Sequence, residues 1–312
     1  MTVFVSHISA FDFWRSTRVR PRFSAIRMPA DMKYVRNDAV VRARAACAIT
    51  PAPIHVNVPR SGVRNPHPNV RFHVDSKAPR YKKFYKIAKG VAVSSPETCL
   101  LELSHKLGRL ELIQACYEIC SGYRIINGEI EKHPPVTSRD EIYKFLETCK
   151  QVDRANRLRW ALHFVSDNSQ SPMETFLSMS FSVPRTLGGY RLPLPTLNYM
   201  VAPNQNTLMR RNYFLCDLYW HSSKLCIEYD SNQFHFNERK LVEDSARRAA
   251  LAACDINTLS ITASQFYNIA LFDEVARAVA GALSVSIPAS SFKFITCRKM
   301  FLAFVRMKQG IT

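Results

Sequence analysis

The sequence lacks the features that mark membrane, secreted and zinc-binding proteins. Its 312 residues contain no uninterrupted apolar run long enough to span a bilayer. The first residues, MTVFVSHISAFDFWR, lack the basic start, apolar stretch and small-residue cleavage site of a secretory signal. The nine cysteines are scattered and form no CxxC pair, which leaves a structural zinc site without support. We therefore expect a cytoplasmic protein with reduced cysteines and no membrane partner.

Acidic residues are also scarce, and the shortage is local. The chain has 25 Asp and Glu against 43 Lys and Arg, a net charge of +18. Residues 1–94 contain 18 basic and 4 acidic side chains, whereas the remainder contains 25 and 21. A basic excess confined to one third of the chain is typical of a module that contacts a polyanion. We favour nucleic acid over a generic solubilising surface, and DNA over other polyanions.

Residues 1–94 are predicted to form a basic, partly β module. A short helix that begins at Ser6 or Ser9 precedes an arginine-rich segment. Alternating stretches at Ile54–Val58, Val70–Val74 and Phe84–Val93 then predict strands of a small sheet. Aromatic residues are interleaved with basic ones here, which suits either a base-stacking surface or a sheet with one apolar and one charged face.

Residues 95–168 are predicted to be helical. Ser95-Pro96-Glu97 has the order of an N-cap, a first-turn proline and an acidic residue at the positive end of a helix. We expect a loop over residues 123–137 and a domain boundary between residues 150 and 170. The further predicted helices are Leu110–Cys120, Ser138–Cys149 and Asp153–Phe164.

Residues 169–287 alternate between helix and strand and predict a compact α/β unit. Helices are expected at Ser171–Ser182, Glu238–Ala253 and Phe272–Leu283, and strands at Leu197–Val201, Tyr213–Tyr219, Leu225–Tyr229 and Thr258–Thr262. The predicted fold class for the whole chain is α/β (α+β), a mixed sheet flanked by helices that follows the basic β-rich and helical region. Residues 288–312 form an extension to which the sequence assigns no role.

The strands around Ser222-Ser223 read as a hairpin that brings acidic residues together. If the turn is centred there, Trp220 faces Leu225 and Asp217 faces Glu228, with Cβ atoms about 5 Å apart. Period-two alternation puts Asp230 on the same face as Glu228. Neighbouring carboxylates inside apolar strands repel each other, and a divalent cation relieves the repulsion. The sequence therefore predicts a metal site rather than solvated strand ends.

The order of a helical Glu, a strand Asp and an acidic pair in the next strand is similar to the PD-(D/E)xK nuclease superfamily. More narrowly, residues 165–285 resemble the very-short-patch-repair-endonuclease-like domains, which stand at the C-terminus of bacterial proteins with abortive-infection (AbiEi-type) antitoxin-like N-terminal parts. The resemblance implies a restriction-endonuclease-like fold. It is carried by Cys216-Asp217-Leu218-Tyr219-Trp220, Leu225-Cys226-Ile227-Glu228-Tyr229-Asp230-Ser231, His235, Asp244-Ser-Ala-Arg247, Leu251 and Ile261-Thr262.

The resemblance implies that Asp217 and Glu228 bind Mg²⁺ or Mn²⁺ and that Glu174 lies near the metal or its water. Ser171 and Glu174 also have the spacing of a capping box, so capping and catalysis both stay open for Glu174. The chain departs from the superfamily at Asp230, which occupies the position of the usual lysine. The repair-endonuclease-like branch relies on histidine instead, which implies His235 as general acid or base. A loop histidine with a surface hydrogen bond is the alternative.

Arg247 or Arg248 is a candidate to hold the scissile phosphate, and a surface ion pair between Asp244 and Arg247 is the alternative. The resulting prediction is a metal-dependent DNA endonuclease that hydrolyses phosphodiester bonds, in DNA repair or phage defence. The alternative is a DNA-binding, antitoxin-like regulator with a catalytically silent nuclease fold. A non-enzymatic interaction protein explains the charge asymmetry least well. A protein partner or a homodimer is left open.

Overall fold

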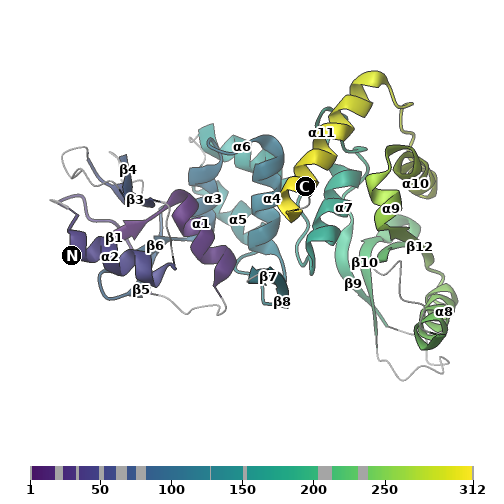
Figure 1. Cartoon of the computed structure of the whole chain (residues 1–312), viewed down its shortest axis with the longest axis horizontal. Coiled ribbons are helices and arrows are strands. Elements are labelled where there is room, and N and C mark those ends of the chain that lie inside the picture. Colours follow the sequence, from purple (N-terminus) through teal and green to yellow (C-terminus); the bar gives the residue numbers. More distant parts are fainter. Residues whose placement is uncertain are drawn as a thin grey trace. The chain divides into compact units, whose positions relative to one another are not determined.

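The computed structural model describes residues 2–17, 24–32, 35–48, 53–60, 69–74, 82–126, 128–149, 153–202, 213–230 and 238–310, with the backbone alone for 238–244. The chain forms two compact units, Met1–His163 and Phe164–Thr312 (Figure 1). The first unit joins the predicted segment 1–94 to residues 95–163, and the second takes residues 164–168 of the predicted segment 95–168 and includes residues 288–312. Helices flank mixed sheets in both units, which confirms the predicted α+β class.

The sheet of the N-terminal unit is mixed, with β1 parallel to β6 and antiparallel to β3. The strands β1 and β6 are wholly buried. The predicted strand Phe84–Val93 is two strands, because Gly90 at a φ of +74° turns the chain between them. The order across the sheet is β2 (Ala25–Ile26), β5 (Phe84–Ala88), β6 (Val91–Ser94), β1 (Val3–Val5), β3 (Ile54–Val58) and β4 (Val70–Val74).

Helices cover this sheet, and several begin where the sequence predicts. Ser95 caps the third helix through its Oγ, which accepts the N–H of Thr98 at 3.2 Å. Trp14 anchors the first helix, because its indole N–H donates to the Ser94 carbonyl oxygen at 2.8 Å. The helices are α1 (His7–Ser16), α2 (Asn37–Ala46), α3 (Pro96–Leu103), α4 (Arg109–Cys120), α5 (Arg139–Glu147) and α6 (Asp153–Leu162).

The prediction of a loop over residues 123–137 is wrong in its first part. Two strands, β7 (Tyr123–Ile126) and β8 (Glu129–Lys132), form an antiparallel hairpin there. Gly128 at a φ of +84° lies in the turn. The strands carry charged residues and the exposed Ile125 and Ile130, so the alternation that would reveal a half-buried strand is weak.

The sheet of the C-terminal unit has the order β12 (Asn257–Thr262), β11 (Leu225–Asp230), β10 (Phe214–Trp220) and β9 (Thr196–Val201). β10 is antiparallel to both of its neighbours, whereas β11 and β12 are parallel. A parallel pair needs a crossover, and α8 (Glu238–Ala253) supplies it. Ala250 and Leu251 of α8 share one buried cluster with Cys216 and Cys226 of the sheet.

Aromatic residues fill a second core in the C-terminal unit. Phe181 of α7 (Pro172–Ser182) packs edge-on against Trp220, with ring centroids 5.6 Å apart. Phe181 also stacks on Phe272 of α10 (Ile269–Ala282) at 5.2 Å. The short α9 (Ala263–Tyr267) follows β12 directly and contributes the buried Phe266. The helix α7 is thereby fixed against the sheet, which sets the position of its N-terminal turn.

The helix α11 (Phe292–Gln309), which the sequence left unassigned, completes this core beside α7 (Figure 1). Arg298 is fully buried, with its guanidinium carbon 4.4 Å from the centre of the Phe272 ring. Its Nη1 donates to the Ser180 Oγ at 3.1 Å and to the Gly188 carbonyl at 3.3 Å. Gly188 follows the 3-10 turn η2 (Arg185–Leu187), at a φ of +87°.

Across the described ranges, no helix combines the length and apolar character that a membrane span requires.

Candidate functional site

The hairpin of β10 and β11 has the register that the sequence predicts. Trp220 lies opposite Leu225, and the pairing continues to Leu218 and Ile227. The turn is the 3-10 segment η3 (His221–Ser223), followed by Lys224 at a φ of +46°. Continued by one position, this register sets Asp217 across from Glu228. The predicted turn and register are therefore confirmed.

Asp217 is held by the neighbouring strand. Its Oδ2 accepts the backbone N–H of Tyr229 at 2.9 Å. Burial raises the pKa of the Asp217 carboxyl above its ordinary value, against the opposing effects of that hydrogen bond and of the charge on Arg247. A carboxylate fixed by a backbone donor in a water-poor environment has few ways to be neutralised except by a proton or a cation.

Glu174 is both a helix cap and a member of the acidic site. The Ser171 Oγ accepts the Glu174 N–H at 3.2 Å, which confirms Ser171 as the N-cap; Glu174 Oε1 accepts the Ser171 hydroxyl at 3.0 Å, whereas a full capping box would use the Ser171 backbone N–H. Glu174 Oε2 accepts the Gln170 N–H at 2.7 Å and the Asn198 side-chain amide at 2.6 Å. Burial, with a smaller contribution from the charge of Asp217, raises the Glu174 pKa to about 7 against the opposing effect of these hydrogen bonds.

Asn198 is a site residue that the sequence did not single out. It lies on β9, and its side-chain amide bridges Glu174 and the carbonyl oxygen of Asn168, 2.9 Å away. Its backbone adopts a φ of +48°, a left-handed conformation that asparagine tolerates better than most residues. An asparagine between Leu197 and Tyr199, in a strand that is otherwise apolar, was the only available signal.

Glu228 is paired with Arg247 of α8. Arg247 Nη2 donates to Glu228 Oε1 and to the Leu215 carbonyl oxygen, with 27% and 22% of the Arg247 and Glu228 side chains exposed. The Nε of Arg247 is buried and has no hydrogen-bond partner among the described residues. The side chain of Asp244, the alternative partner, lies outside the described residues. The structure therefore brings Arg247 to the acidic strands.

The remaining predicted site residues are less central. Asp230 is exposed at the end of β11, and Arg248 is exposed on α8. His235 lies outside the described residues. In the described part of the chain, no group of three or more His, Cys, Asp or Glu side chains is arranged to hold a metal ion. Asp230 is exposed to solvent and Glu228 is engaged by Arg247, so the predicted metal site at Asp217 and Glu228 stays a prediction.

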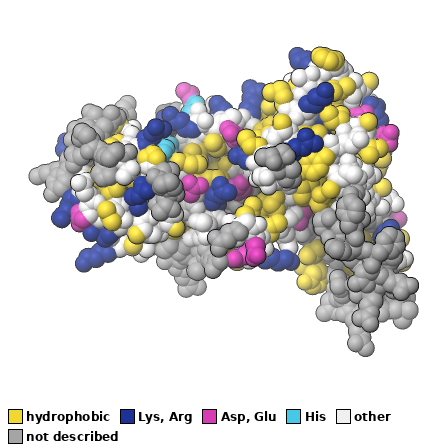
Figure 2. All heavy atoms as spheres, in the orientation of Figure 1, with side chains coloured by type: hydrophobic (Ala, Val, Ile, Leu, Met, Phe, Trp, Pro, Cys, Tyr) yellow, Lys and Arg dark blue, Asp and Glu magenta, His cyan; other side chains and the backbone are white. Residues whose placement is uncertain are grey.

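The basic N-terminal unit carries many of its charges on the surface. Figure 2 shows Lys and Arg side chains spread over the visible face of this unit. Lys83 and Lys86 of the β5 region are exposed, whereas Phe84 between them is buried against Phe4, with ring centroids 5.0 Å apart. Phe84 is therefore part of the core and is not available to stack on a base, and the other aromatic residues of this module leave both alternatives open.

Comparisons of the chain with models of protein families, with curated proteins and with solved structures find no match in any of the three.

Proposed function

We propose that the C-terminal unit is a metal-dependent endonuclease that hydrolyses DNA phosphodiester bonds. The observation that carries the proposal is the pair of carboxylates formed by the buried Glu174 and the half-buried Asp217, which interact electrostatically beside Arg247. Titratable groups whose pKa values are shifted by burial and by a specific neighbour are concentrated at functional sites. The exposed basic residues of the N-terminal unit are proposed to supply phosphate contacts.

The acidic residues suit a divalent cation such as Mg²⁺ or Mn²⁺. Two like charges near each other in a water-poor site favour a bound cation, and carboxylate oxygens are the ligands that hard cations prefer. Asp217 and Glu228 would hold the ion, with Glu174 close to it. When bound, the ion supplies Lewis-acid polarisation of the phosphate and a more acidic water molecule.

The protein's own residues have distinct roles in this proposal. Glu174, with a pKa of about 7, is suited to accept a proton from water near neutral pH. Asn198 positions the Glu174 carboxylate through its 2.6 Å hydrogen bond. Arg247 would contact an incoming phosphate through the exposed part of its guanidinium, since Nη2 already bonds Glu228 and Nε is buried.

The alternative, a DNA-binding regulator with a silent nuclease fold, also has a specific observation in its favour. Arg247 already neutralises Glu228, so this carboxylate has a partner without a metal. Asp230 occupies the position of the lysine expected in the nuclease superfamily. If the Glu228–Arg247 pair and the aspartate at position 230 prevent catalysis, the acidic residues stabilise the fold and the protein binds DNA without cleaving it.

A cleavage assay separates the two functions. Purified protein is incubated with supercoiled plasmid and Mg²⁺, Mn²⁺ or EDTA, beside the variants Glu228→Ala and Glu274→Ala. Glu274 is an exposed carboxylate on α10 and serves as the matched control. The nuclease proposal expects metal-dependent nicking that Glu228→Ala abolishes and Glu274→Ala preserves. A protein that retards DNA in a gel yet nicks nothing with either metal supports the regulator instead.

A further inference from the structure

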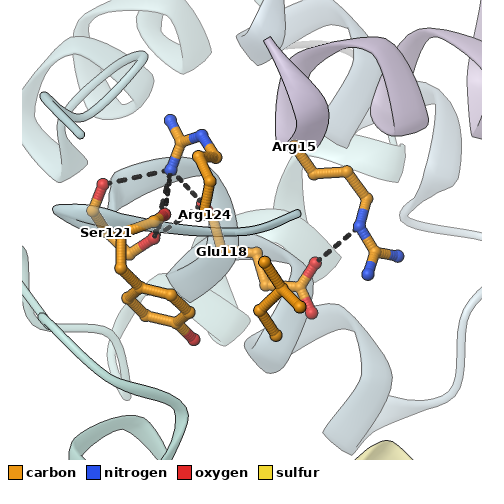
Figure 3. A pocket seen from close by; sticks show the side chains of 6 residues that line it. Arg15, Glu118, Ser121 and Arg124 are labelled. Carbon is orange, nitrogen blue, oxygen red and sulfur yellow. Dashed lines mark hydrogen bonds and ion pairs between the residues drawn. The ribbon is translucent and has the colours of Figure 1, made fainter. Parts of the chain in front are cut away.

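Two of the cavities in the described part of the N-terminal unit differ greatly in size. One lies beside Arg15, Glu118 and Arg124 and has a volume of about 10 Å³ (Figure 3). That is roughly the space of one water molecule, so it excludes a ligand. The other has a volume of about 370 Å³, within the range of sites for small molecules. It is lined, among others, by Asn57, His73, Lys82, Glu102, Lys106 and Arg154.

The floor of the larger cavity is a fixed polar network around Glu102 of α3, a carboxylate that is 2% exposed. It accepts hydrogen bonds from the Lys82 ammonium at 2.9 Å, the Asn57 side-chain amide at 2.5 Å and the His7 backbone N–H at 3.1 Å. Burial alone would raise the Glu102 pKa, but the charges of Lys82 and His7 and these hydrogen bonds outweigh it and lower the pKa. Glu102 therefore stays ionised and orients its donors.

The side chain of Asn57 carries a hydrogen-bond acceptor that has no donor among the described residues. Only 1% of this residue is exposed, and its side-chain amide N–H₂ is committed to Glu102. Its Oδ1 is buried and has no hydrogen-bond partner among the described residues. A buried acceptor without a donor costs about 1–3 kcal/mol, which a ligand hydroxyl in the cavity would recover.

Two histidines line the cavity in the neutral form. The His7 and His73 rings are stacked, with centroids 3.6 Å apart, and His73 Nε2 lies 3.0 Å from the Nδ1 of His55. Burial, with neighbouring positive groups, lowers the His7 pKa to about 4 and the His73 pKa to about 3, although Glu102 opposes both shifts. Neutral imidazoles offer hydrogen bonds without adding charge.

The charge of the cavity is positive. Lys82, Lys106 and Arg154 carry three permanent cations, and Glu102 is the single carboxylate among the described residues that line the cavity. Lys106 and Arg154 are exposed, whereas Lys82 is buried against Glu102. Lys106 and Arg154 are the cations that Glu102 does not pair with. Both are thus exposed to solvent, where they can attract an anion.

From the cationic lining, the orphaned acceptor of Asn57 and the volume, we propose that this cavity binds a phosphomonoester of nucleotide size. The phosphate contacts Lys106 and Arg154, and a hydroxyl of the ligand donates to Asn57 Oδ1. The ligand is either a free nucleotide or the 5′-phosphate end of a DNA strand, which present the same chemistry. This site lies within the N-terminal unit and does not depend on the proposed nuclease activity.

Isothermal titration calorimetry on the full chain tests the proposal, with thymidine 5′-monophosphate, thymidine and inorganic phosphate as probes. We expect thymidine 5′-monophosphate to bind with a dissociation constant at least about tenfold below those of thymidine and phosphate. Lys106→Ala and Arg154→Ala should each weaken binding about tenfold or more, since a hydrogen bond to a charged group contributes on that scale. Lys89→Ala, at the exposed β5–β6 turn, should leave binding unchanged.

Short 5′-phosphorylated and 5′-hydroxyl oligonucleotides identify the source of the phosphate. Preference for the phosphorylated strand, lost in Lys106→Ala, assigns the cavity to DNA ends, whereas binding of the mononucleotide alone assigns it to a free ligand. The proposal is overturned if none of the phosphorylated probes binds, or if Lys106→Ala, Arg154→Ala and Lys89→Ala weaken binding equally. These outcomes are measured as binding and not as plasmid cleavage, so failure of the nuclease proposal would leave them unchanged.

Discussion

Replacing Glu174 by glutamine should stabilise the protein near neutral pH while it removes activity. A folded pKa of about 7, against an ordinary value of 4.5, corresponds to about 3 kcal/mol. Between these values the native state binds more protons than the unfolded state. The free energy of unfolding of the wild type therefore falls as the pH rises from 4.5 to 7 and levels off above 7. The glutamine side chain of the variant is uncharged at every pH, so its free energy of unfolding does not fall in this way.

Thermal unfolding between pH 5 and pH 8 measures the effect. At pH 8 we expect Glu174→Gln to raise the midpoint by several degrees, since 1 kcal/mol corresponds to about 2–4 °C in units of this size. At pH 5 the two midpoints should nearly coincide. Excess Mg²⁺ should raise the wild-type midpoint at pH 8 more than that of the variant, because an ion that binds only the native state stabilises it by mass action.

Glu111→Gln is the matched control. Glu111 also caps a helix, α4, where its carboxylate accepts the Gly108 N–H at 2.7 Å on the exposed surface. It lacks a role in the acidic site, so its replacement should change stability little at any pH and leave cleavage intact. Parallel pH profiles for the wild type and Glu174→Gln would refute the reasoning, since they would mean that Glu174 does not titrate in this range.

Three further outcomes are expected. Arg247→Leu should weaken cleavage at least about tenfold, because it removes a charged phosphate donor and the partner of Glu228. Arg248→Ala should have less effect. Single-turnover kinetics measure both, and equal losses of rate would contradict the role given to Arg247. Gly188→Ala should lower thermal stability by about 2 kcal/mol or more, because an added Cβ would lie 2.6 Å from the Cys297 carbonyl oxygen at a φ of +87°. The logarithm of the DNA association constant should fall linearly with the logarithm of salt concentration, and a flat dependence in a titration would exclude phosphate contacts as its main source.

Local patterns predicted the elements of the candidate site well. The hairpin register followed from the turn centred on Ser222-Ser223, because the position of the turn decides which residues lie opposite each other, as Leu218 and Ile227 do. The start of α7 followed from the spacing of Ser171 and Glu174, because capping is a contact between residues three apart.

Contacts between distant segments were not predictable in the same way. The pairing of Glu228 with Arg247 depends on how α8 crosses the sheet, and the bond from Asn198 to Glu174 depends on an unusual backbone conformation in β9. The strand β1 escaped notice because Val3–Val5 is too short to show a period. Strand register and helix caps depend on residues close in sequence, whereas the charge balance of a site depends on tertiary contacts.

The burial of Arg298 has a consequence for the order of events during synthesis. The four strands of the C-terminal unit all leave the ribosome before α11 does. Until then Phe272 lacks the guanidinium that covers its ring, and Ser180 lacks its Nη1 donor. The helix that carries Glu174 therefore gains its contacts with Arg298 and Phe304 only after translation of α11, so a nascent chain with all four strands complete still lacks part of the core that packs against this helix.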